Sequence, residues 1–341
     1  MTVLSYLSFS EDSLREELCE PGVTVLTLNA SSGVRKFTSP LRALKVIIDQ
    51  QPDVLVGFMF HGMITARLPR RLHGVRALVS SVHSERDSTF REKLLGLTDG
   101  MANVVTVQSQ RVADELCRRG VTTSSRVRVI PNFVKLDAFV PDSRRQETRS
   151  AALGVTDDRF LWLAVGRLAP AKDYPTMLSA FAELSRDRPE AMLAIAGDGP
   201  LRGEIEALVR RLGIVERVKV LGLRRDVPRL LQACDALVLS SAWEGMPVVV
   251  LETMASCRPV VATSVASIPE MLKDGDSGLL VPPGNPEALG KAMVRLMDAS
   301  PEDRQAMADK AFERVRTRYS EGVVLDQWED LFQELLSENG Q

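Results

Sequence analysis

The chain has 341 residues, with 45% apolar and 26% charged residues, which is ordinary for a soluble globular protein and long enough for two domains. Its formal net charge of −2 argues against a nucleic-acid partner, and no apolar run reaches the roughly 18 residues of a membrane span. Residues 1–140 hold 18 Lys and Arg against 14 Asp and Glu, whereas the remainder holds 25 against 31. This imbalance fits either chance scatter of surface charge or an anionic partner of the first part.

Cysteine usage and the N-terminal sequence favour a reducing compartment. Cys19, Cys117, Cys234 and Cys257 form no Cys-x-x-Cys pair, and no histidine stands at metal-ligand spacing from them, so no metal site is expected. The start of the sequence lacks the basic residues and the apolar stretch of a secretion signal. We expect a cytoplasmic protein, with peripheral contact at the inner face of the cell membrane as an option.

Short apolar runs alternate with amphipathic helical stretches along the chain. Runs of four to eight residues, rich in Val and Ile and bounded by polar, Gly or Pro positions, predict strands. The first part has predicted strands at 23–28, 54–59, 77–82, 103–107 and 127–130, and helices at 41–49 and 111–119. The second part has predicted strands at 160–165, 192–196, 218–221, 236–240, 259–262 and 278–281, and helices at 174–186, 201–212, 227–233, 248–256, 268–272 and 287–298. This alternation predicts an α/β fold with two doubly wound parallel-sheet domains.

Composition also predicts where the domains meet. A polar, charge-rich segment with Pro141 at 140–150 separates the two sets of strands, so we expect a first domain at 1–141 and a second domain at 142–318. The last predicted helices, at 301–336, are amphipathic and carry Trp328. Residues 319–341 are therefore expected to form a helix that packs back towards the first domain.

Two carboxylates eight residues apart mark the most informative segment. Glu244 stands in a loop that leads through Gly245 and Pro247 into a predicted helix, and Glu252 stands on that helix. Glycine permits close approach of a ligand to the backbone, and proline favours the first helical turn. Free amides at a helix start bind anions, and flanking carboxylates suit sugar or ribose hydroxyls. The segment predicts a nucleotide-sugar pocket, although each glutamate alone also fits a helix cap or a helix-surface charge.

A second loop supplies cations. Gly166 and Arg167 follow the predicted strand 160–165, and Lys172 comes five residues after Arg167. Ligands of open α/β sheets bind at the carboxyl ends of the strands. The two cations are therefore placed to neutralise a diphosphate and to stabilise a leaving nucleotide without a metal. Such residues are more often solvated surface charges, so this prediction depends on their combination with the two glutamates.

In this combination the chain resembles the retaining glycosyltransferases of family 4 (group 1), which have the GT-B fold of two facing Rossmann-like domains. The resemblance is dense over residues 160–300 and looser before them. The dense motifs are Val165-Gly-Arg-Leu168 with Lys172, Ala196-Gly-Asp-Gly-Pro200, Val220-Leu-Gly-Leu223, Ser240-Ser-Ala-Trp-Glu-Gly-Met-Pro247, Glu252-Thr-Met-Ala255, Pro259-Val-Val-Ala-Thr263 and Gly278-Leu-Leu-Val-Pro282. The looser motifs are Phe60-His-Gly62, Val107-Gln-Ser109 and Val129-Ile-Pro-Asn132.

The resemblance implies a hexosyltransferase that moves a sugar, with retention, from a nucleoside-diphosphate sugar to a glycan or lipid-linked acceptor of polysaccharide, lipopolysaccharide or glycoconjugate biosynthesis. It implies no cofactor and no metal, with a UDP-sugar as the favoured donor and a GDP-sugar as the alternative. Arg167 and Lys172 would hold the diphosphate, Glu244 would sit at the donor sugar, and Glu252 would bind the ribose. Further donor contacts are implied for Gly166, Leu223, Arg224, Gly245, Met246, Pro247 and Val248.

All three histidines lie in the first part. His83 follows the predicted strand 77–82, at a place where related enzymes carry a histidine near the reacting sugar, so it is the catalytic candidate here, against a purely structural role. His61 also follows a predicted strand and is the next candidate. His73 belongs to a basic run at 67–76, which is expected to be a solvated surface or a contact for lipid headgroups or an anionic lipid-linked acceptor.

The chain departs from the family pattern at two places. The family opens with a strand, a Gly-Gly loop and a long helix, whereas no glycine precedes Gly22 here, and segments 2–6, 10–18 and 23–28 resemble the second strand, the helix and the third strand. A first β–α unit of about 40 residues is therefore expected to be missing. Ala266 and Ser267 stand where relatives have a Gly-Gly turn. Two other interpretations stay open: a nucleotide-sugar epimerase of the same fold and a non-catalytic nucleotide-sugar-binding subunit.

Overall fold

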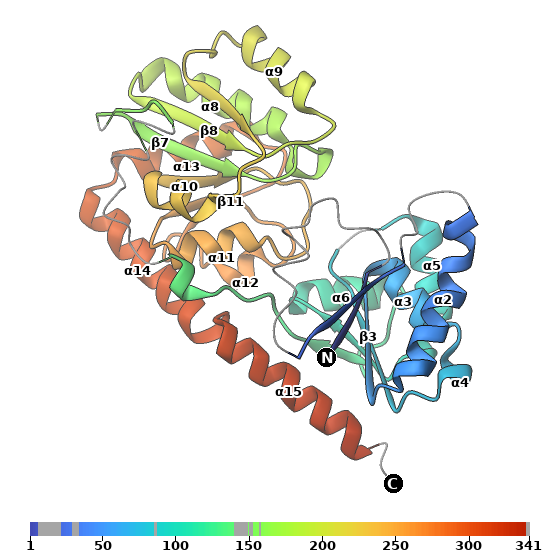
Figure 1. Ribbon diagram of the computed structural model, residues 1–341. Coiled ribbons are helices and arrows are strands. Elements are labelled where there is room, and N and C mark those ends of the chain that lie inside the picture. The colour runs from blue at the N-terminus through green and yellow to red at the C-terminus, as the bar shows by residue number, and fades with distance from the viewer. Residues whose placement is uncertain are drawn as a thin grey trace. The chain divides into compact units, whose positions relative to one another are not determined.

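The computed structural model describes residues 1–5, 22–28, 34–84, 87–139, 149, 153–156 and 158–338, and for residues 34–37 the backbone alone. The predicted helix at 10–18 and most of the predicted boundary segment at 140–150 lie outside the described residues. The chain divides into two compact units (Figure 1). Unit 1 comprises Met1–Val107, Ala113–Val129 and Trp328–Gln341, and unit 2 comprises Gln108–Val112 and Ile130–Gln327.

Unit 1 contains two parallel sheets. β1 (Thr2–Ser5) pairs with β2 (Thr24–Thr27). A four-stranded sheet has the order β3-β4-β5-β6, with bounds Val54–Phe58, Ala77–Ser81, Val104–Val107 and Val127–Val129. Within the described residues, no ladder joins the two sheets. The helices of this unit are α2 (Val34–Gln50), α3 (Met59–Arg67), α4 (Arg70–His73), α5 (Thr89–Leu97), the short η1 (Asp99–Met101) and most of α6 (Gln110–Arg118).

The basic run at 67–76 is only in part the solvated surface that its composition suggests, because Arg71 and Arg76 are exposed whereas Arg67 is buried. The Arg67 guanidinium is 1% exposed and donates to Ser80 Oγ at 2.9 Å, to the Leu95 carbonyl at 2.9 Å and to Thr98 Oγ1 at 3.3 Å. Burial lowers the pKa of Arg67 to about 10. Acceptors from β4 and α5 thus replace the water that a guanidinium requires, and the prediction is wrong for this residue.

His73 is also buried. Its Nε2 lies 3.0 Å from the Ala66 carbonyl, and its Nδ1 accepts from the Val75 amide at 3.3 Å. One nitrogen therefore donates and the other accepts, which is the pattern of a neutral structural imidazole. The neighbouring leucines, in contrast, face solvent: Leu68 is 59% exposed and Leu72 is 70% exposed.

Unit 2 is built on one six-stranded parallel sheet with the order β12-β11-β10-β7-β8-β9. Its strands are β7 (Phe160–Val165), β8 (Ala191–Ala196), β9 (Val218–Gly222), β10 (Ala236–Leu239), β11 (Val260–Thr263) and β12 (Leu279–Val281). Its helices are η2 (Leu136–Phe139), η4 (Pro170–Lys172), α8 (Tyr174–Asp187), α9 (Arg202–Arg211), α10 (Val227–Ala233), α11 (Val248–Ala255), α12 (Ile268–Met271), α13 (Pro286–Asp298), α14 (Pro301–Arg318) and the first part of α15 (Glu321–Glu338).

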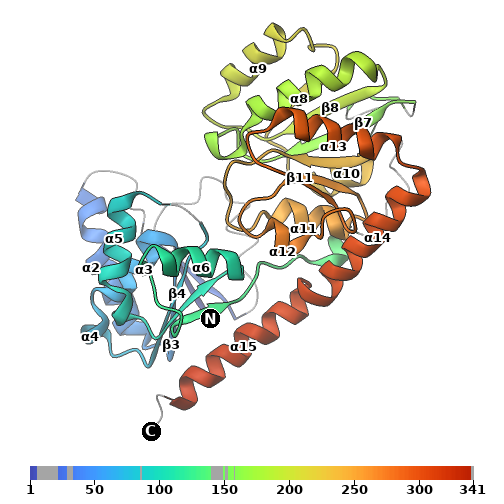
Figure 2. The same cartoon turned by 180° about the vertical axis from the view of Figure 1, so that it is seen from behind.

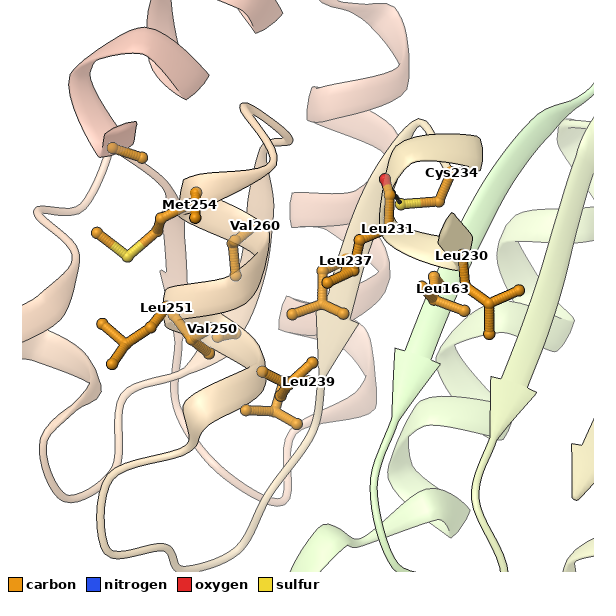
Figure 3. Close-up of a cluster of buried hydrophobic side chains, with 14 of the residues drawn as sticks. Leu163, Leu230, Leu231, Cys234, Leu237, Leu239, Val250, Leu251, Met254 and Val260 are labelled. Atoms are coloured by element: carbon orange, nitrogen blue, oxygen red, sulfur yellow. Dashed lines mark hydrogen bonds between the residues drawn. The ribbon is translucent and has the colours of Figure 1, made fainter. Parts of the chain in front are cut away.

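Both faces of this sheet are covered, as the apolar strands require. Successive side chains of a strand point to opposite faces, so Trp162 and Ile195 pack with residues of α8 and α13. Leu163 and Ala194 pack on the other face with residues of α10, α11 and α14. Figure 3 shows the latter core around β10 and α11, and Figure 2 shows α8 beside α13. The predicted doubly wound α/β architecture is confirmed for this unit.

The end of α15 packs within unit 1. The ring of Trp328 lies 6.5 Å from the ring of Phe58 and 5.6 Å from that of Phe332, centroid to centroid. Arg128 pairs with Glu334 at 3.0 Å. Among the described helices, none combines the length and the apolar character needed to cross a bilayer.

Candidate functional site

The candidate site of unit 2 lies where the strand order of its sheet reverses. β7 is the first strand of this sheet in sequence and lies between β8 and β10, so the chain crosses over in opposite directions on its two sides. The carboxyl ends of strands at such a switch point form the crevice in which open α/β sheets bind ligands. The loop after β7 carries Gly166, Arg167 and Lys172, and the loop after β10 carries Glu244.

An ion pair joins these two loops. Lys172 Nζ lies 2.6 Å from Glu244 Oε1, with the side chains only 16% and 12% exposed. Ser241 Oγ donates to the same oxygen at 2.6 Å. The other carboxylate oxygen of Glu244 has no partner among the residues that the structure describes. Glu244 is therefore fixed through one oxygen, and its second oxygen can accept a further hydrogen bond.

Backbone contacts hold the same two loops together. The Ala242 amide donates to the Ala171 carbonyl at 2.8 Å. The fully buried hydroxyl of Ser240 donates to the carbonyls of Lys172 at 2.8 Å and Asp173 at 3.0 Å. Asp173 has a left-handed backbone (φ 44°) and caps α8 through its carboxylate. Lys172 therefore lies in a short turn whose backbone is held by these hydrogen bonds, so an anion at Lys172 would cost less conformational freedom.

Glycines follow β7 and β8 directly, and they allow close approach of the two loops. A Cβ on Gly166 would lie 2.8 Å from Lys172 Cε, and a Cβ on Gly197 would lie 1.9 Å from the Gly166 carbonyl oxygen. Tyr174 donates its hydroxyl to that carbonyl at 3.0 Å. Burial, together with the charge of Glu244, raises the pKa of Tyr174, so its hydroxyl keeps the proton that it donates.

Helix α11 begins at Val248, directly after Pro247. Val248 and Glu252 are one turn apart and share the side of the helix that is not fully buried. The Glu252 carboxylate has no partner within the described part of the chain, and burial raises its pKa. The amide of Met246 likewise has no acceptor there. Free donors at the positive end of a helix and an unpartnered carboxylate one turn further on can bind a phosphate and a hydroxyl together.

The remaining predicted donor residues occupy neighbouring strand ends. Leu223, after β9, is 70% exposed, and Arg224 forms a two-pronged pair with Asp226 at 2.6 and 2.7 Å. This pairing raises the pKa of Arg224. The exposed Arg167 side chain has no partner among the described residues. Direct contacts therefore join Gly166, Lys172 and Glu244, while the other predicted residues lie at the same edge of the sheet.

His83 belongs to unit 1 and follows β4. Its Nε2 lies 2.9 Å from Ser81 Oγ, and its ring lies 5.5 Å from that of Phe58. Burial lowers the pKa of His83. It lines a pocket whose other walls include Met59, Phe60 and further apolar side chains. His61 is exposed. No group of three potential metal-binding side chains occurs in the part of the chain that the structure describes.

The sequence did not predict the hydroxyl groups that support the site. Ser240, Ser241, Thr263 and Ser267 are all fully buried. Thr263 Oγ1 donates to the Ser241 carbonyl at 2.7 Å, and Ser267 Oγ donates to the Gly245 carbonyl at 2.8 Å. The available signal was their position near the ends of two strands: Ser240 and Ser241 follow β10, Thr263 ends β11, and Ser267 lies in the turn after β11.

Two family profiles cover most of the chain. The profile of the glycosyl transferases group 1 matches residues 145–314, and that of the Glycosyltransferase Family 4 matches residues 2–138. The first of these ranges contains the dense motifs that follow residue 160, and the second contains the looser motifs.

Individual proteins agree with these profiles. The chain is 32% identical over 239 residues to the alpha-D-kanosaminyltransferase of Streptomyces kanamyceticus, a match of 69% of this chain and 61% of that protein. It is 24% identical over 276 residues to an Escherichia coli UDP-Gal:alpha-D-GlcNAc-diphosphoundecaprenol alpha-1,3-galactosyltransferase, covering 78% and 71%. The structure of Anabaena HepE in complex with UDP and glucose superposes with a TM-score of 0.86 at 20% identity, covering 98% and 91%. This likeness confirms the GT-B fold, and together with the profiles it identifies the chain as a member of the group 1, family 4 glycosyltransferases.

Proposed function

We propose that this protein transfers a sugar from a UDP-sugar to a glycan or lipid-linked acceptor, with retention of the anomeric configuration and without a metal. The observation that carries this proposal is the Lys172–Glu244 ion pair at the switch point of unit 2. A cation at this edge of the sheet suits a diphosphate, and a carboxylate with one unpartnered oxygen suits a hydroxyl of the attached sugar.

The residues divide the chemistry between them. Lys172 and Arg167 supply positive charge to the diphosphate as the bond from the sugar C1 to the phosphate oxygen breaks. Glu244 orients the sugar through its free oxygen, and Glu252 accepts from the ribose hydroxyls. The acceptor oxygen forms a bond to C1 on the face that the nucleotide leaves. The acceptor proton passes to the leaving phosphate oxygen, so the products are the glycoside and UDP.

Uracil as the base is supported by named relatives. The Escherichia coli relative is named for UDP-Gal, and HepE is described in complex with UDP and glucose. The exposed Leu223 beside the Arg224–Asp226 pair offers an apolar surface for such a base. These observations favour a UDP-sugar over a GDP-sugar for this chain.

A donor panel tests the proposal. A UDP-sugar at about 100 times its Kd is expected to stabilise the protein by about 2.7 kcal/mol, measured by thermal unfolding against GDP- and ADP-sugars. With an acceptor, NMR of the product should show the donor's anomeric configuration, and transfer should persist in EDTA. Conversion of the UDP-sugar into an epimer without acceptor would favour an epimerase. Binding without transfer over a broad acceptor panel would favour a non-catalytic subunit.

For the acceptor side, we propose that α4 contacts an anionic membrane surface. Arg67 and His73 are turned inward, while Leu68 and Leu72 are exposed beside the exposed Arg71. Exposed leucines next to a cation suit the boundary between headgroups and acyl chains. The Escherichia coli relative is named for an acceptor on diphosphoundecaprenol, which is a lipid.

The double substitution Leu68→Ser and Leu72→Ser is expected to reduce binding to vesicles severalfold, because apolar burial drives interfacial binding. Sedimentation with vesicles of phosphatidylcholine, with and without about one third phosphatidylglycerol, measures the effect; the anionic fraction should strengthen binding of the unmodified protein. Leu325→Ser is the matched control, because Leu325 is exposed in unit 2. Equal binding of all variants, or indifference to lipid charge, would contradict the proposal.

A further inference from the structure

The turn after β11 contacts the loop that carries Glu244. Ser267 is fully buried, and its hydroxyl donates to the Gly245 carbonyl at 2.8 Å. The Ser267 amide donates to the same oxygen at 3.4 Å. The preceding Ala266 adopts a left-handed backbone with φ 44°, a conformation that costs a non-glycine residue about 1 kcal/mol. The turn therefore keeps an unfavourable backbone conformation that brings Ser267 within hydrogen-bond distance of the Gly245 carbonyl.

This contact also fixes the direction of the Met246 N–H, which belongs to the same peptide unit as the Gly245 carbonyl. A trans peptide is planar, and its C=O and N–H point in opposite directions. Because the Gly245 carbonyl points towards Ser267, the Met246 N–H points away from Ser267. That N–H has no acceptor in the described part of the chain.

A second side chain fixes the other end of Met246. Asn132 Nδ2 donates to the Met246 carbonyl at 3.0 Å, and the Asn132 amide lies 3.3 Å from the Met246 sulfur. The Gly245 and Met246 carbonyls, which flank the Met246 N–H, are thus both held by hydrogen bonds. The next residue, Pro247, has no N–H, so Met246 supplies the last backbone donor before helix α11 begins at Val248.

We infer that Ser267 is a positioning residue for donor binding: with Asn132, it presents the Met246 N–H to an oxygen of the donor diphosphate. This inference rests on the proposed function. An N–H group that is already oriented needs no reorganisation when the diphosphate binds. Its hydrogen bond strengthens as negative charge grows on the leaving nucleotide.

The test compares ligands with and without phosphates. Ser267→Ala is expected to weaken UDP binding about fivefold to tenfold, the size of one hydrogen bond, while uridine binding stays unchanged. With a UDP-sugar, kcat/KM should fall by a similar factor. Isothermal titration of UDP, and displacement of UDP by uridine, give the two affinities. Ser185→Ala is the matched control, because Ser185 is a buried serine of α8 whose hydroxyl donates to a backbone carbonyl.

If Ser267→Ala does not fold, Asn132→Ala provides the test. It removes the hydrogen bond to the Met246 carbonyl and should also weaken binding of UDP more than binding of uridine. An unchanged ratio of UDP to uridine affinity in the folded variants would overturn the role of Ser267. An unmodified protein that binds neither UDP nor a UDP-sugar would instead overturn the proposed function.

Discussion

Replacing Lys172 by alanine is expected to lower kcat for sugar transfer by about 100-fold to 1000-fold, the effect of removing one preorganised group from a developing charge. Lys172 is the cation that contacts Glu244 at 2.6 Å, and the Ser240 hydroxyl holds its backbone carbonyl. Its loss removes charge from the diphosphate and leaves the Glu244 carboxylate with Ser241 as its remaining partner. Both binding and transfer of the donor should therefore suffer.

Steady-state kinetics with a UDP-sugar measure this effect, and thermal unfolding shows whether the variant is folded. Lys291→Ala is the control, because Lys291 forms an exposed pair with Glu287 on α13, and exposed pairs contribute little. Full activity of the Lys172 variant would place the diphosphate elsewhere.

Glu252→Gln is expected to weaken donor binding about 10-fold to 100-fold and yet to stabilise the free protein at neutral pH. The weaker binding follows from the loss of charged hydrogen bonds to the ribose, each of about 1.5–3 kcal/mol. The stabilisation follows from burial, which raises the pKa of Glu252 above its unfolded value. The stability that this group contributes is present below the unfolded pKa and is lost as the pH rises through the folded pKa.

The two proteins should therefore have equal stability in acid, and the glutamine variant should gain its advantage as the pH rises through the raised pKa. Thermal unfolding from pH 4 to 8 without ligand measures this, and titration with UDP-sugar measures the loss of affinity. Glu329→Gln, at an exposed position of α15, is the control. A variant that is less stable than the parent at pH 8 would show that the carboxylate has a structural partner.

The sequence predicted the sheet of unit 2 well because its strands are continuous apolar runs. The strands at 160–165 and 192–196 appear as β7 and β8 within one residue, since a strand buried on both faces leaves a local signal. The sequence also placed Lys172 and Glu244 after predicted strands, whereas the structure showed that these strands, β7 and β10, are neighbours. These predictions depended on local patterns alone.

Other features depended on partners far away in the chain. Arg67 is buried because Ser80, Leu95 and Thr98 supply acceptors, and nothing within the basic run distinguishes it from a solvated arginine. The contact of Ser267 with Gly245 joins positions 22 residues apart. A single sequence does not specify such pairs, because a serine hydroxyl fits many loops equally well.

The Lys172–Glu244 pair also bears on how the spent nucleotide departs. On the proposed function, a diphosphate that binds Lys172 would compete with a carboxylate that is attached to the next loop and therefore keeps a high effective concentration. After sugar transfer, Glu244 is expected to pair with Lys172 again and to replace the nucleotide as its partner. This competition is expected to shorten the residence time of the product UDP.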